Sequence, residues 1–223
     1  NRAASLWLSS LTAAPRSGVL ARVSGGRFNI MDATVIDRLA QANVLVIGDV
    51  LIDRFVEGRV SRVSPEAPVP VLKHARERAL LGGAGNVAAN ILSYGARASL
   101  VALSGTDAGA EDLTRLCAGF PRLKTHFVKD RSRPTTVKTR FLSGWHQLLR
   151  VDAEETHAMA RAVAEKVVAK AVAAIPKAGA VVLSDYAKGV LDATTIRAII
   201  AAARKAGVPV VVDPKKSDPS VFA

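Results

Sequence analysis

The order of its apolar runs leaves few folds open to this chain. Runs typical of buried strands occur at 44–53, 98–105, 180–185 and 208–214, and segments with helical spacing occur at 86–94, 109–120, 156–175 and 192–206. Near-continuous apolar strands are typical of a sheet covered on both faces, and helices of this length can connect parallel neighbours. The pattern predicts an α/β fold with a mostly parallel sheet.

Two regions depart from this alternation. Residues 54–80 contain the prolines of "SPEAPVPV", which exclude a helix and predict an edge strand or a flap. Residues 125–130 are typical of a further strand, and 135–142 and 147–152 are typical of an antiparallel pair joined by the turn "SGWH".

Composition places the chain among ordinary globular proteins. Of its 223 residues, 49% are apolar and 22% are charged, and no apolar run is long enough to span a membrane. Cys117 is the single cysteine, which excludes an internal disulfide, and no Cys/His spacing is typical of a zinc site. We therefore expect a cytoplasmic protein without a membrane partner.

The formal net charge of +12 raises the question of a nucleic-acid partner. Four arginines lie in residues 1–30, which contain no acid, and most of the other excess cations are spread singly. Aromatic residues make up only 4% of the chain, which leaves few surfaces on which bases could stack. We therefore expect no nucleic-acid partner.

Residues 1–30 are rich in Ser, Ala and Arg, which is the composition of an organellar transit peptide. The alternative is upstream sequence translated ahead of a true start at Met31. We favour the second reading because regular patterning begins only after this segment. The expected domain is thus 31–223, with 1–30 a disordered or non-native extension.

Polar residues stand where the predicted strands end, and loops converge on ligands at the carboxyl edge of an open parallel sheet. These residues are Asp49, Asp53, Ser104, Asp107, Asp185, Lys188, Asp213 and Lys215. Their convergence predicts a binding site at that edge.

The stretch "GGAGN" at 82–86 precedes a predicted helix. It is not the dinucleotide fingerprint, because the third glycine position holds Ala88, and it is not a Walker loop, because no Gly-Lys-Ser/Thr follows. Glycines let the main chain approach a ligand, and the N–H groups that begin a helix favour hydroxyl or anionic oxygens. The alternative is a tight turn before the helix.

Charged side chains extend this candidate site, and each has an ordinary structural alternative. Asp53 can accept hydrogen bonds from two neighbouring sugar hydroxyls, or it can be a turn or cap residue. The planar guanidinium groups of Arg133, Arg140 and Arg150 suit bidentate phosphate binding, or they lie on a solvated sheet face.

The loop "SDYAKG" places the acid Asp185 close to the base Lys188, although the two could form a mere surface pair. The histidines share no spacing with a Ser or Cys nucleophile, so we expect them to be structural or exposed. They are His74, His126, His146 and His157.

Five segments carry a resemblance to a known family: "GDVLIDRFVEGRVSRVSPEAPVPV", "GGAGNVAANILSYGA", "RPTTVKTRFLSGWHQLLRVD", "LSDYAKGVL" and "VVVDPK". With them, residues 44–215 resemble the ribokinase-like, or PfkB, sugar kinases. "SPEAPVPV", "TRFLSGWHQLLR" and "SDYAKG" resemble more closely the heptose 7-phosphate kinases of bacterial lipopolysaccharide synthesis. The resemblance implies a three-layer α/β/α fold with a small β lid at about 54–80.

The resemblance also implies roles for particular residues. In such kinases the residues matching Asp53 and Asn86 hold sugar hydroxyls, and those matching Gly82 and Gly83 bring the main chain against the sugar. The residue matching Asp185 lies at the sugar pocket.

The phosphate that the substrate already carries requires basic residues. Arg133 and Arg150 match positions that bind it in related phosphosugar kinases, and Arg140 and Lys188 are further candidates. The lid often forms the contact of a homodimer in this family.

The resemblance implies ATP and Mg²⁺ as cofactors and transfer of the γ-phosphoryl group to the anomeric hydroxyl of heptose 7-phosphate, which gives the 1,7-bisphosphate used in ADP-heptose synthesis. The family's catalytic Gly-Ala-Gly-Asp signature does not occur in the 223 residues. We therefore expect an amino-terminal fragment that does not turn over, with the general base and most of the nucleotide site beyond Ala223. The alternatives are another PfkB kinase, for a hexose phosphate or a nucleoside, and a dinucleotide-binding oxidoreductase.

Overall fold

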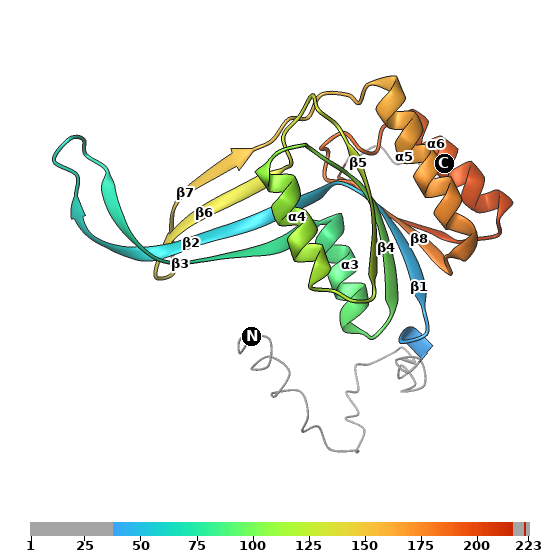
Figure 1. The fold of residues 1–223 in the computed structure, drawn as a ribbon, viewed down its shortest axis with the longest axis horizontal. Helices are drawn as coiled ribbons and strands as arrows, with labels where there is room; N and C mark the ends of the chain where they lie inside the picture. The colour runs from blue at the N-terminus through green and yellow to red at the C-terminus, as the bar shows by residue number, and fades with distance from the viewer. Residues whose placement is uncertain (1–37, 216–220, 222–223) are drawn as a thin grey trace, which may run out of the picture. The chain divides into compact units, whose positions relative to one another are not determined.

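The computed structural model describes residues 38–215 and 221. The predicted extension at 1–30 lies outside the described residues. The chain divides into two compact units, 1–32 and 33–223, and all described residues belong to the second. Within that unit, Figure 1 shows a central sheet flanked by helices, from which a second sheet extends.

Within residues 38–215, five parallel strands form the central sheet, which we call sheet A. The strands lie in the order β5-β4-β1-β8-β9, and every neighbouring pair is parallel. Their bounds are Asn43–Gly48 (β1), Arg97–Ser104 (β4), Leu123–Lys129 (β5), Ala180–Ser184 (β8) and Val210–Asp213 (β9). The predicted parallel sheet is therefore confirmed.

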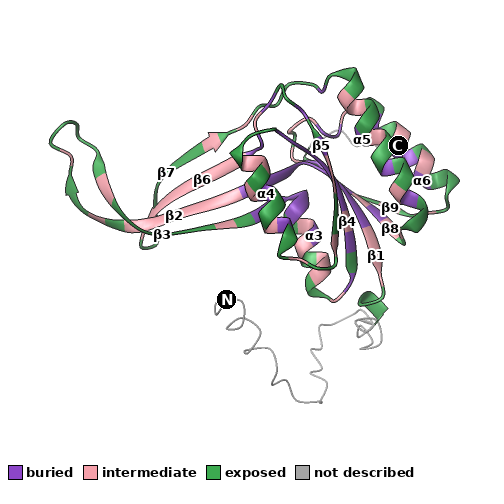
Figure 2. Cartoon of the chain, viewed as in Figure 1, coloured by how far each residue is buried: buried purple, intermediate pink, exposed green. Residues whose placement is uncertain are grey.

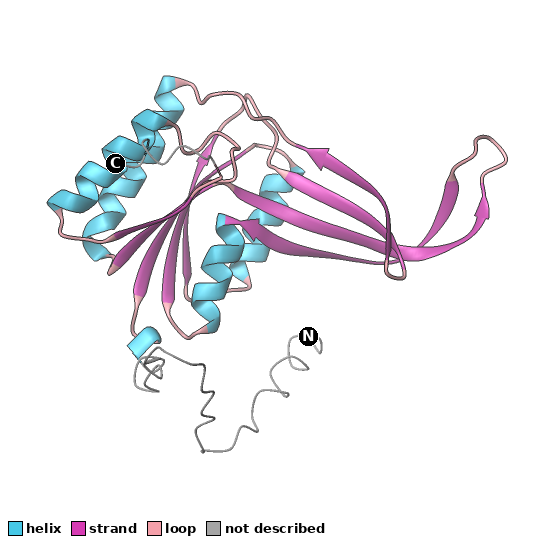
Figure 3. Ribbon diagram, turned by 180° about the vertical axis from the view of Figure 1, so that it is seen from behind, coloured by secondary structure: helices cyan, strands magenta, loops and turns pink. Residues whose placement is uncertain are grey.

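Helices cover both faces of sheet A, as the view from behind in Figure 3 shows. Their bounds are Ala84–Ser93 (α3), Ala108–Ala118 (α4), Arg161–Ala174 (α5), which continues into the 3-10 turn Ile175–Lys177 (η1), and Ala193–Lys205 (α6). In β1, Leu45 and Ile47 pack with α5 and α6, whereas Val46 packs with α3 and α4. All three are fully buried, and burying each such side chain contributes about 1.5–3 kcal/mol. The three-layer α/β/α fold is confirmed.

Four further strands of the described segment form a mixed sheet, which we call the lid sheet. Their bounds are Val50–Val63 (β2), Pro70–Gly83 (β3), Val137–Ser143 (β6) and His146–Ala153 (β7). The order is β3-β2-β6-β7, with β2 parallel to β6 and the outer pairs antiparallel. The predicted flap and the predicted antiparallel pair thus belong to one sheet. Figure 2 shows that buried residues gather in sheet A and that the far part of the lid sheet is largely exposed.

The prediction of one strand over 44–53 was wrong. β1 ends at Gly48, and β2 begins at Val50 in the other sheet. A Cβ at Gly48 would overlap the main-chain oxygen of Ser184, so glycine allows β1 to approach β8 closely where the chain leaves sheet A. The apolar run hides this break because the residues on both sides of it are buried.

Two predicted helix boundaries also need correction. The helix predicted at 156–175 begins only at Arg161, because the preceding residues have no regular structure and bury Met159 in the core of sheet A. The helix predicted at 86–94 begins at Ala84, directly after the last residue of β3, so no separate glycine turn precedes it.

Candidate functional site

A cavity of about 540 Å³ lies where the lid sheet meets the carboxyl edge of sheet A. It brings together six of the predicted residues, which are Asp53, Gly82, Gly83, Asn86, Arg140 and Arg150. It is also lined by four polar or aromatic residues that the sequence reasoning missed: Phe55, Phe120, Lys138 and Tyr186. Three predicted residues do not line it, namely Arg133, Asp185 and Lys188.

Alternation along β2 provides one wall of the cavity. Successive strand residues point to opposite faces, so Leu51, Asp53 and Phe55 share a face, and all three line the cavity. The sequence had suggested that Asp53 ends a strand of the parallel sheet. In the structure it lies inside β2, a strand of the lid sheet.

Asp53 forms an ion pair with Arg140 of β6, and the two side chains are 25% and 24% exposed. The Arg140 guanidinium lies 5.4 Å from the centroid of the Phe55 ring, which is cation–π range. A carboxylate accepts hydrogen bonds and a guanidinium donates them. The pair can therefore receive a ligand that offers both hydroxyls and an anionic group.

Both interpretations of the glycine segment have support in the structure. A Cβ at Gly82 would overlap the Leu51 side chain and lie 2.5 Å from the Asp53 Oδ2 atom, so glycine lets both side chains keep these positions at the wall. Gly83 has a φ of 56°, which favours glycine, and the N–H that follows it donates to the main-chain oxygen of Asp49 at 2.9 Å. The segment makes a sharp strand-to-helix junction and also lines the cavity.

Asn86 is the third residue of α3, and its side chain does not cap the helix. It is exposed and lines the cavity, so its amide is accessible to a ligand. Asn86 reaches this site because it lies in the first turn of α3, and its side chain has no role as a helix cap.

A charge network runs from the cavity to the loop after β8. The Lys138 ammonium lies 2.6 Å from an Asp152 oxygen and 2.9 Å from a Glu154 oxygen. Arg150 contacts Asp152 at 2.9 Å, and Lys188 contacts Glu154 at 2.8 Å. The hydrogen bond from Lys138 lowers the pKa of Asp152. Burial lowers the pKa of Lys138, but its bonds to the two carboxylates outweigh this and leave that pKa raised.

Lys138 could have been found from the strand pattern. It precedes Arg140 by two residues on β6, so the two side chains lie on the same face of the strand. Both line the cavity. Lys188 is outside the lining but joins these cations through the network.

Asp49 is 1% exposed and organises the loop that follows β8. Its carboxylate accepts main-chain hydrogen bonds from Tyr186 at 2.8 Å and from Lys188 and Val190 at 3.0 Å. Burial raises the pKa of Asp49 even though these three donors favour the charged form. Asp49 thus holds the loop in place, and the loop places Tyr186 at the cavity.

Asp185 is buried beneath the same loop. Its Oδ1 atom accepts a hydrogen bond from the Ala187 N–H at 2.8 Å, and Ala187 has a φ of 56°, which is unusual for a residue with a Cβ. The Oδ2 atom of Asp185 is buried without a hydrogen-bond partner among the described residues. A buried carboxylate oxygen without a donor is costly, so Asp185 is suited to meet a ligand or a water.

Arg133 is buried outside the cavity and is engaged on all sides. It contacts the Asp130 carboxylate at 2.8 Å and donates to the main-chain oxygens of Lys188 at 3.0 Å and His157 at 2.8 Å. These contacts connect three loops. They leave Arg133 far less accessible to a phosphate than Arg140 or Arg150.

Neither a metal cluster nor a membrane helix is found in the described part of the chain. Among residues 38–215 and 221, no group of three or more His, Cys, Asp and Glu side chains could hold a metal ion. The helices in these ranges are all too short or too polar to cross a membrane.

Curated relatives match most of the chain. The chain is 52% identical over 176 residues to the bifunctional protein HldE of Azorhizobium caulinodans. This alignment covers 78% of this chain and 37% of that protein. It is 50% identical to the HldE of Caulobacter sp., with 79% of this chain and 36% of that protein covered. The chain therefore spans little more than a third of the length of these relatives.

Solved structures share the fold. A Staphylococcus aureus protein described as a putative phosphofructokinase aligns with a TM-score of 0.65 at 11% identity, and the alignment covers 81% of this chain and 55% of that one. The phosphofructokinase-2 of Escherichia coli, in complex with fructose-6-phosphate, aligns with a TM-score of 0.61 at 17% identity, covering 81% and 57%. A family model described as pfkB family carbohydrate kinase matches residues 41–223. This chain belongs to the pfkB family of carbohydrate kinases.

Proposed function

We propose that this chain forms the acceptor-binding part of an ATP-dependent kinase that phosphorylates the anomeric hydroxyl of D-glycero-D-manno-heptose 7-phosphate. The Asp53–Arg140 ion pair on the wall of the 540 Å³ cavity carries this proposal, because it offers an acceptor for sugar hydroxyls beside a cation for a phosphate. The identity to HldE proteins and the heptose kinase motifs support the choice of sugar.

The polar side chains that line the cavity form two sets, which would bind different parts of the substrate. Asp53 and Asn86 offer oxygen atoms and an amide to sugar hydroxyls. Lys138, Arg140 and Arg150 supply cations for the phosphate that the substrate already carries. Lys138 contacts two carboxylates and its side chain is 14% exposed, whereas Arg140 and Arg150 each contact one carboxylate and are 24% and 49% exposed. We therefore propose Arg140 and Arg150 as the first phosphate contacts.

These residues would bind and orient the acceptor, so that its anomeric hydroxyl lies in line with the transferred group. When bound, ATP with Mg²⁺ supplies the phosphoryl group and neutralises the charge that develops on it. The described residues offer no metal-binding cluster, so we assign none of them to the metal. We also assign no general base within this chain.

The test compares two aspartates in the full-length protein. Asp53→Asn removes the charge that would hold the hydroxyls, and we expect a KM for heptose 7-phosphate about tenfold to hundredfold higher. Asp112→Asn is the matched control, because Asp112 also pairs with arginines, is 24% exposed and lies outside the cavity. Equal kinetics for the two variants would refute the proposal. Faster turnover of a hexose phosphate or a nucleoside would favour another member of the family.

We further propose that the lid sheet faces a second copy of the chain. Large apolar side chains are exposed along it, among them Val63 (63%), Leu149 (56%) and Val151 (48%), and Trp145 at the turn between β6 and β7 is fully exposed. Aspartate at Leu149 and Val151 should shift the full-length protein to a smaller species in sedimentation velocity. A wild-type protein that sediments as a monomer would contradict this.

A further inference from the structure

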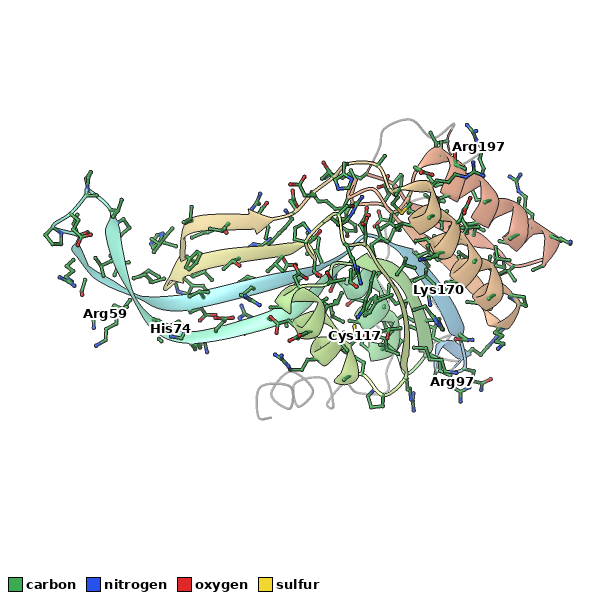
Figure 4. The ribbon with its side chains drawn as sticks, turned by 45° about the horizontal axis from the view of Figure 1, so that its top comes forward. Arg59, His74, Arg97, Cys117, Lys170 and Arg197 are labelled. Atoms are coloured by element: carbon green, nitrogen blue, oxygen red, sulfur yellow. The ribbon has the colours of Figure 1, made fainter. Side chains whose placement is uncertain are left out.

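A second cleft lies at the opposite edge of sheet A from the 540 Å³ cavity, which we call the sugar cavity after its proposed ligand. Its volume is about 550 Å³, and it is formed by the amino ends of β1, β4 and β5 with α5 and η1. Figure 4 labels Arg97 on β4 and Lys170 on α5 at this end of the unit, far from Arg59 and His74 in the lid sheet.

The charge of this cleft has one sign. Five cations line it, together with His126; they are Arg97, Arg122, Lys124, Lys170 and Lys177. Within the described residues, no Asp or Glu lines the cleft, and none of the five cations forms an ion pair. Like charges gathered in this way repel one another unless an anion joins them. These cations are spread singly along the sequence, but the fold brings the five of them to one cleft.

Strand register explains how the cations come to share one cleft. Leu45, Ser99 and Lys124 lie side by side on β1, β4 and β5, so they share a sheet face, and α5 covers the buried Leu45 on that face. Lys170 approaches from α5, and His126 follows Lys124 on the same face of β5. Burial and then the charges of Lys170 and Lys124 lower the pKa of His126.

We propose that this cleft binds a small, multiply charged phosphate compound, at a site separate from the sugar cavity. Its volume matches that of small-molecule pockets, which is about 300–1,000 Å³. Lys and Arg donors hold phosphate oxygens, and those of this cleft have no carboxylate partner within residues 38–215. No Phe, Tyr or Trp among the described residues lines the cleft, which argues against stacked nucleotide bases.

Inorganic pyrophosphate is the probe for this site, titrated calorimetrically into the full-length protein. The double variant Lys124→Gln/Lys170→Gln should bind it at least about tenfold more weakly, because two charged contacts are lost. Lys166→Gln is the matched control, since Lys166 is an exposed lysine of α5 outside the cleft and should leave the affinity unchanged. Circular dichroism of each variant establishes that it is folded.

A second readout ties binding to this cleft. Pyrophosphate should raise the pKa of His126 in the histidine ring NMR spectrum of the wild type, because an anion offsets the neighbouring lysines. Equal pyrophosphate affinity in the double variant, or no binding by the wild type, would overturn the proposal. Tighter binding of an oligothymidylate through the same two lysines would overturn it in favour of nucleic acid. Unchanged heptose 7-phosphate kinetics in the double variant would separate this site from the proposed sugar site.

Discussion

Replacing Arg133 by methionine tests whether this residue stabilises the fold or binds substrate. The side chain is 5% exposed, and its partner Asp130 is 4% exposed. Methionine keeps an unbranched apolar stem in place of the arginine methylene groups but removes the charge and every donor. Asp130 would then keep only the hydrogen bonds from the N–H and hydroxyl of Ser132, at 2.9 and 2.6 Å.

The expected loss follows from this burial. Breaking a buried ion pair by removing one partner costs about 3–5 kcal/mol, because the other charge stays buried. Two main-chain oxygens, of Lys188 and His157, also lose a donor. A domain of ordinary stability, about 5–15 kcal/mol, would lose at least about a fifth of it.

Urea unfolding of the full-length protein, followed by circular dichroism, measures this loss. The matched control is Arg161→Met, since Arg161 and Glu165 lie 2.8 Å apart, as Arg133 and Asp130 do, but on an exposed helix face. The control should leave the midpoint unchanged, because exposed pairs of this kind often contribute nothing measurable. If Arg133→Met unfolds like the control and raises the KM for heptose 7-phosphate, the reasoning is refuted and Arg133 is a ligand residue.

Three further predictions concern single groups. Gly82→Ala should abolish tight phosphosugar binding, because the new Cβ would press on the Asp53 carboxylate, and wild-type affinity would contradict this. The hydrogen bond from Lys138 lowers the pKa of Asp152, so ionised Asp152 stabilises the fold above about pH 4. This contribution is lost as the pH falls through the lowered pKa. Asp152→Asn should therefore lower the melting temperature near neutrality and converge with the wild type in acid; a constant difference would disprove this. Burial raises the pKa of the Cys117 thiol to about 11, so iodoacetamide should alkylate it at neutral pH only after unfolding, and rapid labelling of the native protein would be inconsistent.

The centre of sheet A was predictable because β1, β4 and β8 are largely buried, and such strands are near-continuous apolar runs in the sequence. The lid sheet was predicted only as separate pieces. β2 pairs in parallel with β6, placing Asp53 beside Lys138, and no local pattern reports a pairing between strands so far apart in the chain. The break at Asp49 was hidden because the residues on both sides are apolar.

The candidate site shows the same division. Residue type and position in predicted strands pointed to Asp53, Arg140 and Arg150, which line the cavity. Arg133 looked equivalent to the other arginines because a sequence records charge and not exposure. Its loop folds inward, and the carboxylate that meets it there is only three residues away.

The position of Asp49 has a mechanical consequence. This residue is the single link between β1 and β2, so it is one of the points at which the chain passes from sheet A into the lid sheet. The carboxylate of the same residue accepts three main-chain hydrogen bonds from the loop at 186–190. A change in backbone direction at Asp49 would therefore also displace this loop and with it Tyr186, which lines the cavity.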